Sequence, residues 1–239
     1  MSRRMLAGVI FLGVVMMLEG DAWADVIAWT DWTSFTAGTT TGTATGAMAT
    51  TSGPVGVSYA GQVLSNSNTN NTAGGVSWLP ASTFSGGSIS NAPPFRDIIT
   101  LQGGTGTGTN TITFSTPVVD PVMAIWSLGS GAAPASFVFS ASEPFTIQSG
   151  GPSVEFGGSS ITKAGNVVNG AEGNGTIRFS GTFSQITWTN PQTEFFYGFT
   201  AGVTGVAGSG GVPGPSTLVT FVMGLLVLAP FVRRRRGHP

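Results

Sequence analysis

Carboxylates are the residues of this chain best placed to do chemistry. Glycoside hydrolysis needs two carboxyl groups that face each other, and Glu155, Glu172 and Glu194 are the candidates for such a pair. Each of them stands in a stretch with the pattern of a strand end or a turn, where solvated acidic side chains are the common case. We therefore predict that the chain is not an enzyme, with glycan hydrolysis as the alternative.

Other catalytic groups are scarce in this sequence. The only histidine is His238, close to the C-terminus, and there is no cysteine, so the rest of the chain can form neither a Ser-His-Asp triad nor a cysteine zinc site. Lys163 is the only lysine, and nothing around it has the pattern of a Schiff-base pocket. The glycine-rich stretch 103–110 leads into a predicted strand, whereas a phosphate-binding loop opens a helix. We predict no cofactor.

Calcium is the metal that the remaining oxygen ligands would suit. Carboxylates and loop carbonyl oxygens suit calcium in jelly-roll domains, and Asp97, in FRDII, and Asp120, in VVDP, are the candidate ligands. The favoured interpretation of Asp97 is structural, either as a partner of Arg96 or as the cap of a turn. The prediction is therefore no metal site, with calcium at these two aspartates as the alternative.

Aromatic side chains offer a second route to a function, because their flat faces can stack on sugar rings. Trp126 and Trp188 stand in apolar segments and are predicted core residues. Trp29 and Trp32 are three positions apart, which puts them on opposite faces of a strand and leaves at most one exposed. Trp78, in a predicted loop, is the best candidate for an exposed ligand-binding ring, although a buried position is the default for any tryptophan.

The elements that would position these residues are strands. Residues 109–117 alternate between apolar and polar types, with Ile112 and Phe114 on one face, and residues 121–129 are nearly all apolar, as in a strand buried on both sides. Such short segments, separated by turn residues and without helical periodicity, predict an all-β antiparallel sandwich or jelly roll over residues 25–202. Further strands are expected at 25–32, 55–64, 135–140, 143–150, 153–158, 175–181, 183–189 and 194–203.

Two low-complexity segments interrupt this pattern. Residues 36–53 consist largely of Thr, Gly and Ala, and residues 65–75 form a polar tract. Both are predicted to be loops or irregular edge strands. Residues 25–211 carry eight acidic and three basic side chains, a net charge of −5. A body of this charge cannot neutralise a run of phosphates, so no nucleic-acid partner is expected.

The N-terminal residues 1–24 have the three parts of a secretory signal peptide. Arg3 and Arg4 precede an apolar stretch of 14 residues, 5–18, and Ala22 and Ala24 supply the small residues of a cleavage site. The mature protein would then begin at Asp25. The alternative, a retained helical anchor, is disfavoured because the apolar stretch is short for a hydrocarbon core of about 30 Å.

The C-terminal residues have the pattern of a membrane anchor. Residues 218–232 are 15 uncharged residues followed by four arginines, and a helix of that length spans about 22 Å. Residues just before it and the long arginine side chains extend the span, so a single transmembrane helix is predicted at 217–232. The arginine cluster stays in the cytoplasm, which leaves the preceding chain exported. Residues 203–211 are predicted to be a flexible Gly-rich tether.

The end of the chain also resembles a known sorting signal. Val212, Pro213, Pro215, Ser216 and Thr217 precede the apolar span, which contains Gly224 and ends at Arg233, Arg234, Arg235 and Arg236. This order is similar to the PEP-CTERM sorting signal, with Gly214 in place of the motif's glutamate. The resemblance implies an exported bacterial protein that an exosortase-like protease of the inner membrane cuts near the proline motif. It also implies an association with exopolysaccharide and biofilm matrix.

Together these patterns predict an exported, non-enzymatic bacterial surface or extracellular-matrix protein. Its precursor would be anchored in the inner membrane with the body in the periplasm, and the processed protein would reach the cell surface or the matrix. A carbohydrate-binding module that retains matrix polysaccharide is the alternative from a different class. An ordinary permanent anchor with a proline-rich stalk is the alternative for the C-terminal segment.

Overall fold

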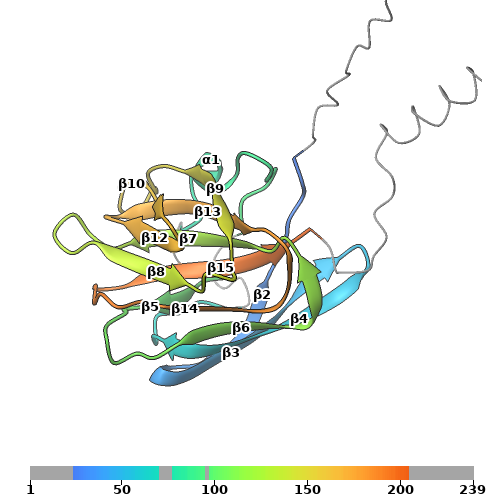
Figure 1. Ribbon diagram of the computed structural model, residues 1–239, viewed down its shortest axis with the longest axis horizontal. Coiled ribbons are helices and arrows are strands. Elements are labelled where there is room, and N and C mark those ends of the chain that lie inside the picture. The colour runs from blue at the N-terminus through green and yellow to red at the C-terminus, as the bar shows by residue number, and fades with distance from the viewer. Residues whose placement is uncertain (1–23, 70–76, 95–96, 205–239) are drawn as a thin grey trace, which may run out of the picture. The chain divides into compact units, whose positions relative to one another are not determined.

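Two large β-sheets make up most of the folded part of the chain (Figure 1). The computed structural model describes residues 24–69, 77–94 and 97–204, which lie within the unit Trp23–Gly210. All strand pairs in it are antiparallel except β10 with β13. The prediction of an all-β antiparallel domain is therefore confirmed.

The first sheet has seven strands. Its main path is β1 (Ala28–Trp29), β15 (Tyr197–Val203), β7 (Val122–Leu128), β13 (Gly173–Phe179) and β10 (Ser159–Ser160). In addition, β5 (Ile99–Leu101) pairs with β15, and β9 (Phe145–Gly150) pairs with β13.

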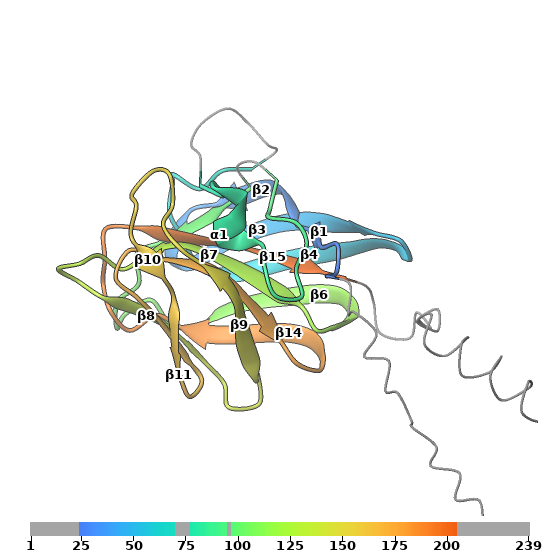
Figure 2. The ribbon, with the colours of Figure 1, turned by 90° about the horizontal axis from the view of Figure 1, so that it is seen from above.

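The second sheet has eight strands in one continuous order. They are β11 (Thr162–Ala164), β12 (Val167–Gly170), β8 (Ala135–Phe139), β14 (Thr182–Thr189), β6 (Asn110–Val119), β4 (Gly53–Val63), β3 (Gly38–Thr50) and β2 (Asp31–Thr36). The single short helix of the described residues, α1 (Ala81–Phe84), belongs to neither sheet. It contacts β9 and β13 of the seven-stranded sheet, next to which it lies at the top of Figure 1, and Figure 2 shows the domain from that side.

The main core fills the space between the two sheets, as in other sandwiches. Trp188 of β14 lies at its centre. Its ring stacks on Tyr59 and Phe137 at centroid distances of 5.9 and 5.7 Å and meets Phe199 edge-on at 5.1 Å. The predicted core position of Trp188 is confirmed, since it is almost fully buried.

Strand β7 is buried on both faces, as its apolar pattern predicts. Met123 and Ile125 face the main core. Val122, Ala124 and Trp126 belong to a second apolar cluster, to which the segment around α1 contributes Trp78, Phe84 and Ile89. The seven-stranded sheet is thus covered by the second sheet on one side and by the α1 segment on the other.

Several strand predictions need correction. Residues 36–53, expected as a loop or an irregular edge strand, contain β3, which lies between β2 and β4. Its buried face is made of Ala44 and Met48, so the apolar alternation is too weak to detect. Residues 153–158, expected as a strand, form a turn closed by two backbone hydrogen bonds between Ser153 and Gly157. The short strands β5, β10, β11 and β12 were not expected.

The two N-terminal tryptophans do not share one strand. Trp29 belongs to β1 of the seven-stranded sheet and Trp32 to β2 of the eight-stranded sheet. The chain passes from one sheet to the other at Thr30, whose N–H and Oγ1 both donate to the carbonyl of Ala201. Trp32 belongs to the main core and Trp29 to the second apolar cluster, so both rings are buried. Neither ring offers a face to a ligand.

The ends of the domain lie close to the predicted boundaries. Asp25 forms a bridge with Ile89, and β15 includes Val203, one residue beyond the predicted end of the domain. No helix of residues 24–69, 77–94 and 97–204 combines the length and hydropathy needed to cross a membrane. The predicted signal helix, the tether after residue 204, the sorting motif at 212–217 and the predicted span at 217–232 lie outside the described residues and stay predictions.

Candidate functional site

Exposed aromatic rings gather at one place on the seven-stranded sheet. Phe156 and Phe195 are 50% and 80% exposed, and both contact Phe196, at centroid distances of 6.0 and 5.4 Å. Beneath them lies Trp126, only 4% exposed, at 5.3 Å from Phe156 and 5.9 Å from Phe196. We call Trp126, Phe156, Phe195 and Phe196 the aromatic patch. Clustered exposed apolar side chains of this kind mark an interaction site more often than single ones do.

Short polar contacts hold the two exposed rings outward. The turn that carries Phe156 is closed by Ser153, whose Oγ accepts the Phe156 N–H at 3.3 Å. The loop before β15 is held by Glu194, whose N–H donates to the carbonyl of Gln102 at 2.8 Å and whose carboxylate accepts the Phe196 N–H at 3.1 Å. Phe196 can therefore pack on Trp126 while Phe195, the residue before it, points outward.

A β-bulge shapes the floor of the patch. Between the pairs Gly173–Leu128 and Gly175–Ile125, two residues of β7, Trp126 and Ser127, stand opposite the single residue Asn174. The Ser127 N–H donates to Asn174 Oδ1 at 2.8 Å. Bulges next to binding sites commonly redirect a side chain, and this one changes the direction of the chain directly after Trp126.

Glu172 is tied to this bulge. It lies where the chain crosses from β12 to β13, and its Oε2 accepts the Ser127 hydroxyl at 2.7 Å. Both residues have left-handed backbones, with φ of 58° for Glu172 and 54° for Ser127. A non-glycine residue pays roughly 1–2 kcal/mol for that conformation, and such strain clusters at functional sites.

Glu172 is close enough to Glu194 to influence the pKa of the Glu194 carboxyl. Burial raises the pKa of the Glu194 carboxyl above its ordinary value, and the negative charge of Glu172 raises it further, against backbone hydrogen bonds from Phe195 and Phe196 that lower it. Glu155 directly precedes Phe156 in the chain. The structure thus brings Glu172 and Glu194, two of the three glutamates of the hydrolase alternative, to the aromatic patch. The side chain of Glu155 is half-buried, and its Oε2 is shielded from solvent.

Trp78, the predicted ligand-binding ring, is not exposed. It is 2% exposed, and its ring meets Phe84 edge-on at 5.2 Å. The segment that carries it folds back over the seven-stranded sheet, so the indole becomes part of the second apolar cluster. The prediction of a sugar-stacking role for Trp78 is therefore wrong.

The two aspartates considered for calcium have different surroundings. Asp120 Oδ1 accepts the Gly181 N–H at 2.7 Å, and its Oδ2 lies 3.8 Å from the guanidinium of Arg178. Asp97 is buried, and its predicted partner Arg96 lies outside the described residues. In the part of the chain that the structure describes, no three acidic, histidine or cysteine side chains form a metal-binding group.

The predicted first residue of the mature protein is docked on the domain. The Asp25 carboxylate pairs with Arg178 at 2.6 Å, and the Asp25 N–H donates to the carbonyl of Ser88 at 2.8 Å. Ala24 is exposed, and Ala22 lies outside the described residues. The sorting-motif residues Val212 to Thr217 and the four arginines also lie outside them.

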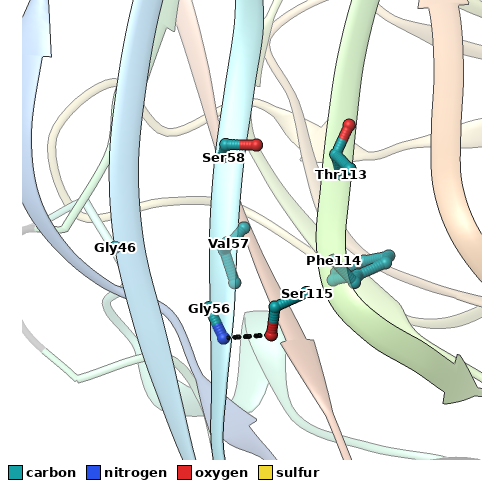
Figure 3. Close-up of a pocket in the computed structure, with 7 residues that line it drawn as sticks. All are labelled: Gly46, Gly56, Val57, Ser58, Thr113, Phe114 and Ser115. Carbon is teal, nitrogen blue, oxygen red and sulfur yellow. Dashed lines mark hydrogen bonds between the residues drawn. The ribbon is translucent and has the colours of Figure 1, made fainter.

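A shallow hollow of about 270 Å³ lies on the eight-stranded sheet (Figure 3). Ser58 and Thr113 line it from neighbouring strands, and Ser115 accepts the Gly56 N–H on its Oγ at 2.9 Å. All seven residues that line it are uncharged. The hollow can form hydrogen bonds but offers no acid or base, so the aromatic patch is the stronger candidate site.

No protein-family model, curated protein or solved structure matches this chain. What the aromatic patch can do is therefore inferred from its own chemistry. Two exposed rings can stack on a ligand with apolar faces, while the neighbouring carboxylates accept hydrogen bonds from hydroxyl groups. A sugar polymer has both features.

Proposed function

We propose that the chain is an exported, non-enzymatic bacterial surface or extracellular-matrix protein whose β-sandwich domain binds polysaccharide at the aromatic patch. One observation carries the binding role: Phe156 and Phe195 are exposed, yet both rest on a packed aromatic base. Rigid, exposed rings lose little conformational freedom when a ligand stacks on them. Sugar rings present C–H faces for such stacking and hydroxyl groups for Glu172 and Glu194.

The route of export rests on the two ends of the chain. The signal-peptide pattern and the PEP-CTERM-like motif support a precursor that is held in the inner membrane and then cut by an exosortase-like protease. Within the described residues, the strand contacts run from Asp25 to Val203, which supports that route. Both predicted cleavage regions would then lie outside the sheets.

Mass spectrometry of the protein from fractionated cells tests the route. We expect an envelope or matrix product that begins at Asp25 and ends within or near residues 212–217. Replacing Arg233 to Arg236 by alanine should leave the N-terminal cut intact and disturb the C-terminal one, because the cytoplasmic charge that positions the motif is removed. An intact cytosolic protein from Met1 to Pro239 would contradict the proposal.

Polysaccharide binding is tested by removing the two exposed rings. The double variant Phe156→Ala/Phe195→Ala should bind matrix polysaccharide at least about tenfold more weakly, since two stacking contacts are together worth more than about 1.4 kcal/mol. Affinity electrophoresis of the purified full chain in polysaccharide-containing gels measures the change. Val119→Ala, at an exposed apolar residue of β6, is the matched control and should bind like the unchanged protein. If the polysaccharide slowed the unchanged protein, the double variant and Val119→Ala to the same extent, the binding role would be contradicted.

Glycan hydrolysis is the second candidate, and the raised pKa of Glu194 beside Glu172 is the observation that favours it. Incubation with the same polysaccharides, followed by an assay for new reducing ends, separates the two functions. A non-catalytic module produces none. Release that disappears in both Glu172→Gln and Glu194→Gln would assign the patch to a hydrolase instead.

A further inference from the structure

The charges around the aromatic patch are of one sign. The Glu172 carboxylate accepts the Ser127 hydroxyl directly after Trp126, and the Glu194 carboxylate accepts the Phe196 N–H. Within residues 24–69, 77–94 and 97–204, the only basic residues are Lys163 and Arg178. A ligand of the patch therefore meets an acidic surface.

Both of these basic side chains are engaged away from the patch. Lys163 lies over the ring of Phe145, 4.6 Å from its centroid, and donates to the carbonyl of the same residue. Arg178 pairs with Asp25 and Asp120 and donates to the hydroxyl of Ser88. Neither can compensate Glu172 and Glu194 without giving up these contacts.

The aromatic rings favour a positive ligand as well. The face of an aromatic ring attracts a cation, and Phe156 and Phe195 expose such faces next to the carboxylates. Trp126, at the base of the patch, is 4% exposed, and its Nε1–H has no hydrogen-bond partner among the described residues. This donor is buried beneath the rings, so recognition of a ligand rests on the exposed rings and the carboxylates.

We propose that the ligand of the aromatic patch is an amino-sugar polymer, a polysaccharide whose rings carry free, protonated amino groups. This inference rests on the proposed function and names the ligand class of the same site. The sugar rings would stack on Phe156 and Phe195, while the ammonium groups pair with Glu172 and Glu194. An anionic polysaccharide would instead be repelled by the same carboxylates and by a domain of net negative charge.

The deciding experiment compares two ligands that differ only in charge. The purified full chain is titrated at about pH 6 with glucosamine oligomers and with N-acetylglucosamine oligomers of equal length, using intrinsic tryptophan fluorescence or calorimetry. Amino groups are mostly protonated there. We expect the glucosamine oligomers to bind about five- to tenfold more tightly, since an exposed ion pair contributes up to about fivefold and the contacts repeat along the chain. The preference should shrink as salt is added.

Variants separate the charge effect from stacking. Glu172→Gln/Glu194→Gln should bind both oligomers alike, whereas Phe156→Ala/Phe195→Ala should lose both. Asp31→Asn, at an exposed acid of β2, removes one negative charge, as Glu194→Gln does, and should keep the preference. Glu194→Gln alone provides the test if replacing the strained Glu172 prevents folding, and it should weaken the preference for glucosamine oligomers.

Each remaining outcome overturns a different statement. Equal binding of the two oligomers to the unchanged protein would overturn the inference and leave the proposed function standing. Binding of neither sugar, nor of any matrix polysaccharide, would overturn the proposed function itself. If oligolysine of equal charge binds as tightly and depends on the same residues, the patch recognises basic peptides and the sugar assignment is wrong.

Discussion

Replacing Asn110 by alanine is expected to lower the free energy of unfolding by about 3 kcal/mol, because it removes three buried hydrogen bonds, each worth roughly 1 kcal/mol. Asn110 is almost fully buried at the start of β6. Its Oδ1 accepts the Tyr59 hydroxyl at 2.6 Å and the Gln62 N–H at 3.0 Å, and its Nδ2 donates to Asn190 Oδ1 at 3.0 Å. Alanine can replace none of these bonds.

The effect is large because Asn110 connects several strands. Tyr59 and Gln62 belong to β4, and Asn190, which follows β14, donates in turn to the carbonyl of Ser136 in β8 at 2.8 Å. Four strands of the eight-stranded sheet therefore share one buried hydrogen-bond network. In such a network, losing one member affects more than its own contacts.

Urea unfolding measures this change, and an unchanged m-value would show that stability alone was altered. Thr109→Ala is the matched control, since Thr109 adjoins Asn110 in the chain but is exposed. Its effect should stay within about 0.5 kcal/mol, as is usual for surface substitutions. Similar midpoints for the two variants would mean that the network is not needed for stability.

How far the sequence predicts the fold depends on which side chains each strand buries. Strand β7 is predictable because all of its buried residues except Ser127 are apolar, and β6 because Ile112 and Phe114 alternate with polar residues. Strand β3 is not predictable, because it buries Ala44 and Met48 among threonines and glycines. Its place between β2 and β4 comes from hairpin pairing with the strands before and after it in the chain, which its composition does not reveal.

The candidate site is less predictable than the fold. Glu155, Glu172 and Glu194 can be selected by residue type, but the three connecting segments that carry them approach one another only in the folded chain. The exposure of the two rings cannot be predicted from the sequence, and the reason is local. Phe156 and Phe195 stand in apolar stretches with the pattern of strands, whereas the backbone forms a turn at the first and a loop before β15 at the second.

Gly158 is the residue at which a small change should most disturb the aromatic patch. It lies against the crossing that carries Glu172, and a Cβ added there would stand 2.0 Å from the Glu172 carbonyl oxygen. That oxygen already accepts the Ser159 N–H at 3.1 Å and Asn174 Nδ2 at 3.0 Å. In Gly158→Ala, the loop carrying Phe156 therefore has to move away from Glu172, and the pairing of β10 with β13 is expected to weaken with it.

Gly157→Ala provides a matched control one residue away. Both glycines have left-handed backbones, with φ of 80° at Gly158 and 68° at Gly157, but a Cβ at Gly157 meets nothing within 4 Å. Gly157→Ala should therefore lower the free energy of unfolding by only about 1–2 kcal/mol, the conformational penalty alone. Gly158→Ala should carry that penalty and roughly 2 kcal/mol more from the steric overlap.

Binding separates the two variants further. Gly157→Ala should retain most of its affinity for matrix polysaccharide, because Phe156 keeps its place on Trp126. Gly158→Ala should lose about as much affinity as the variant that lacks both exposed rings, since the displaced loop separates Phe156 from Glu172. Urea unfolding and affinity electrophoresis on the same preparations measure both effects. Equal stability and equal binding of the two alanine variants would mean that close contact between Gly158 and Glu172 does not position the patch.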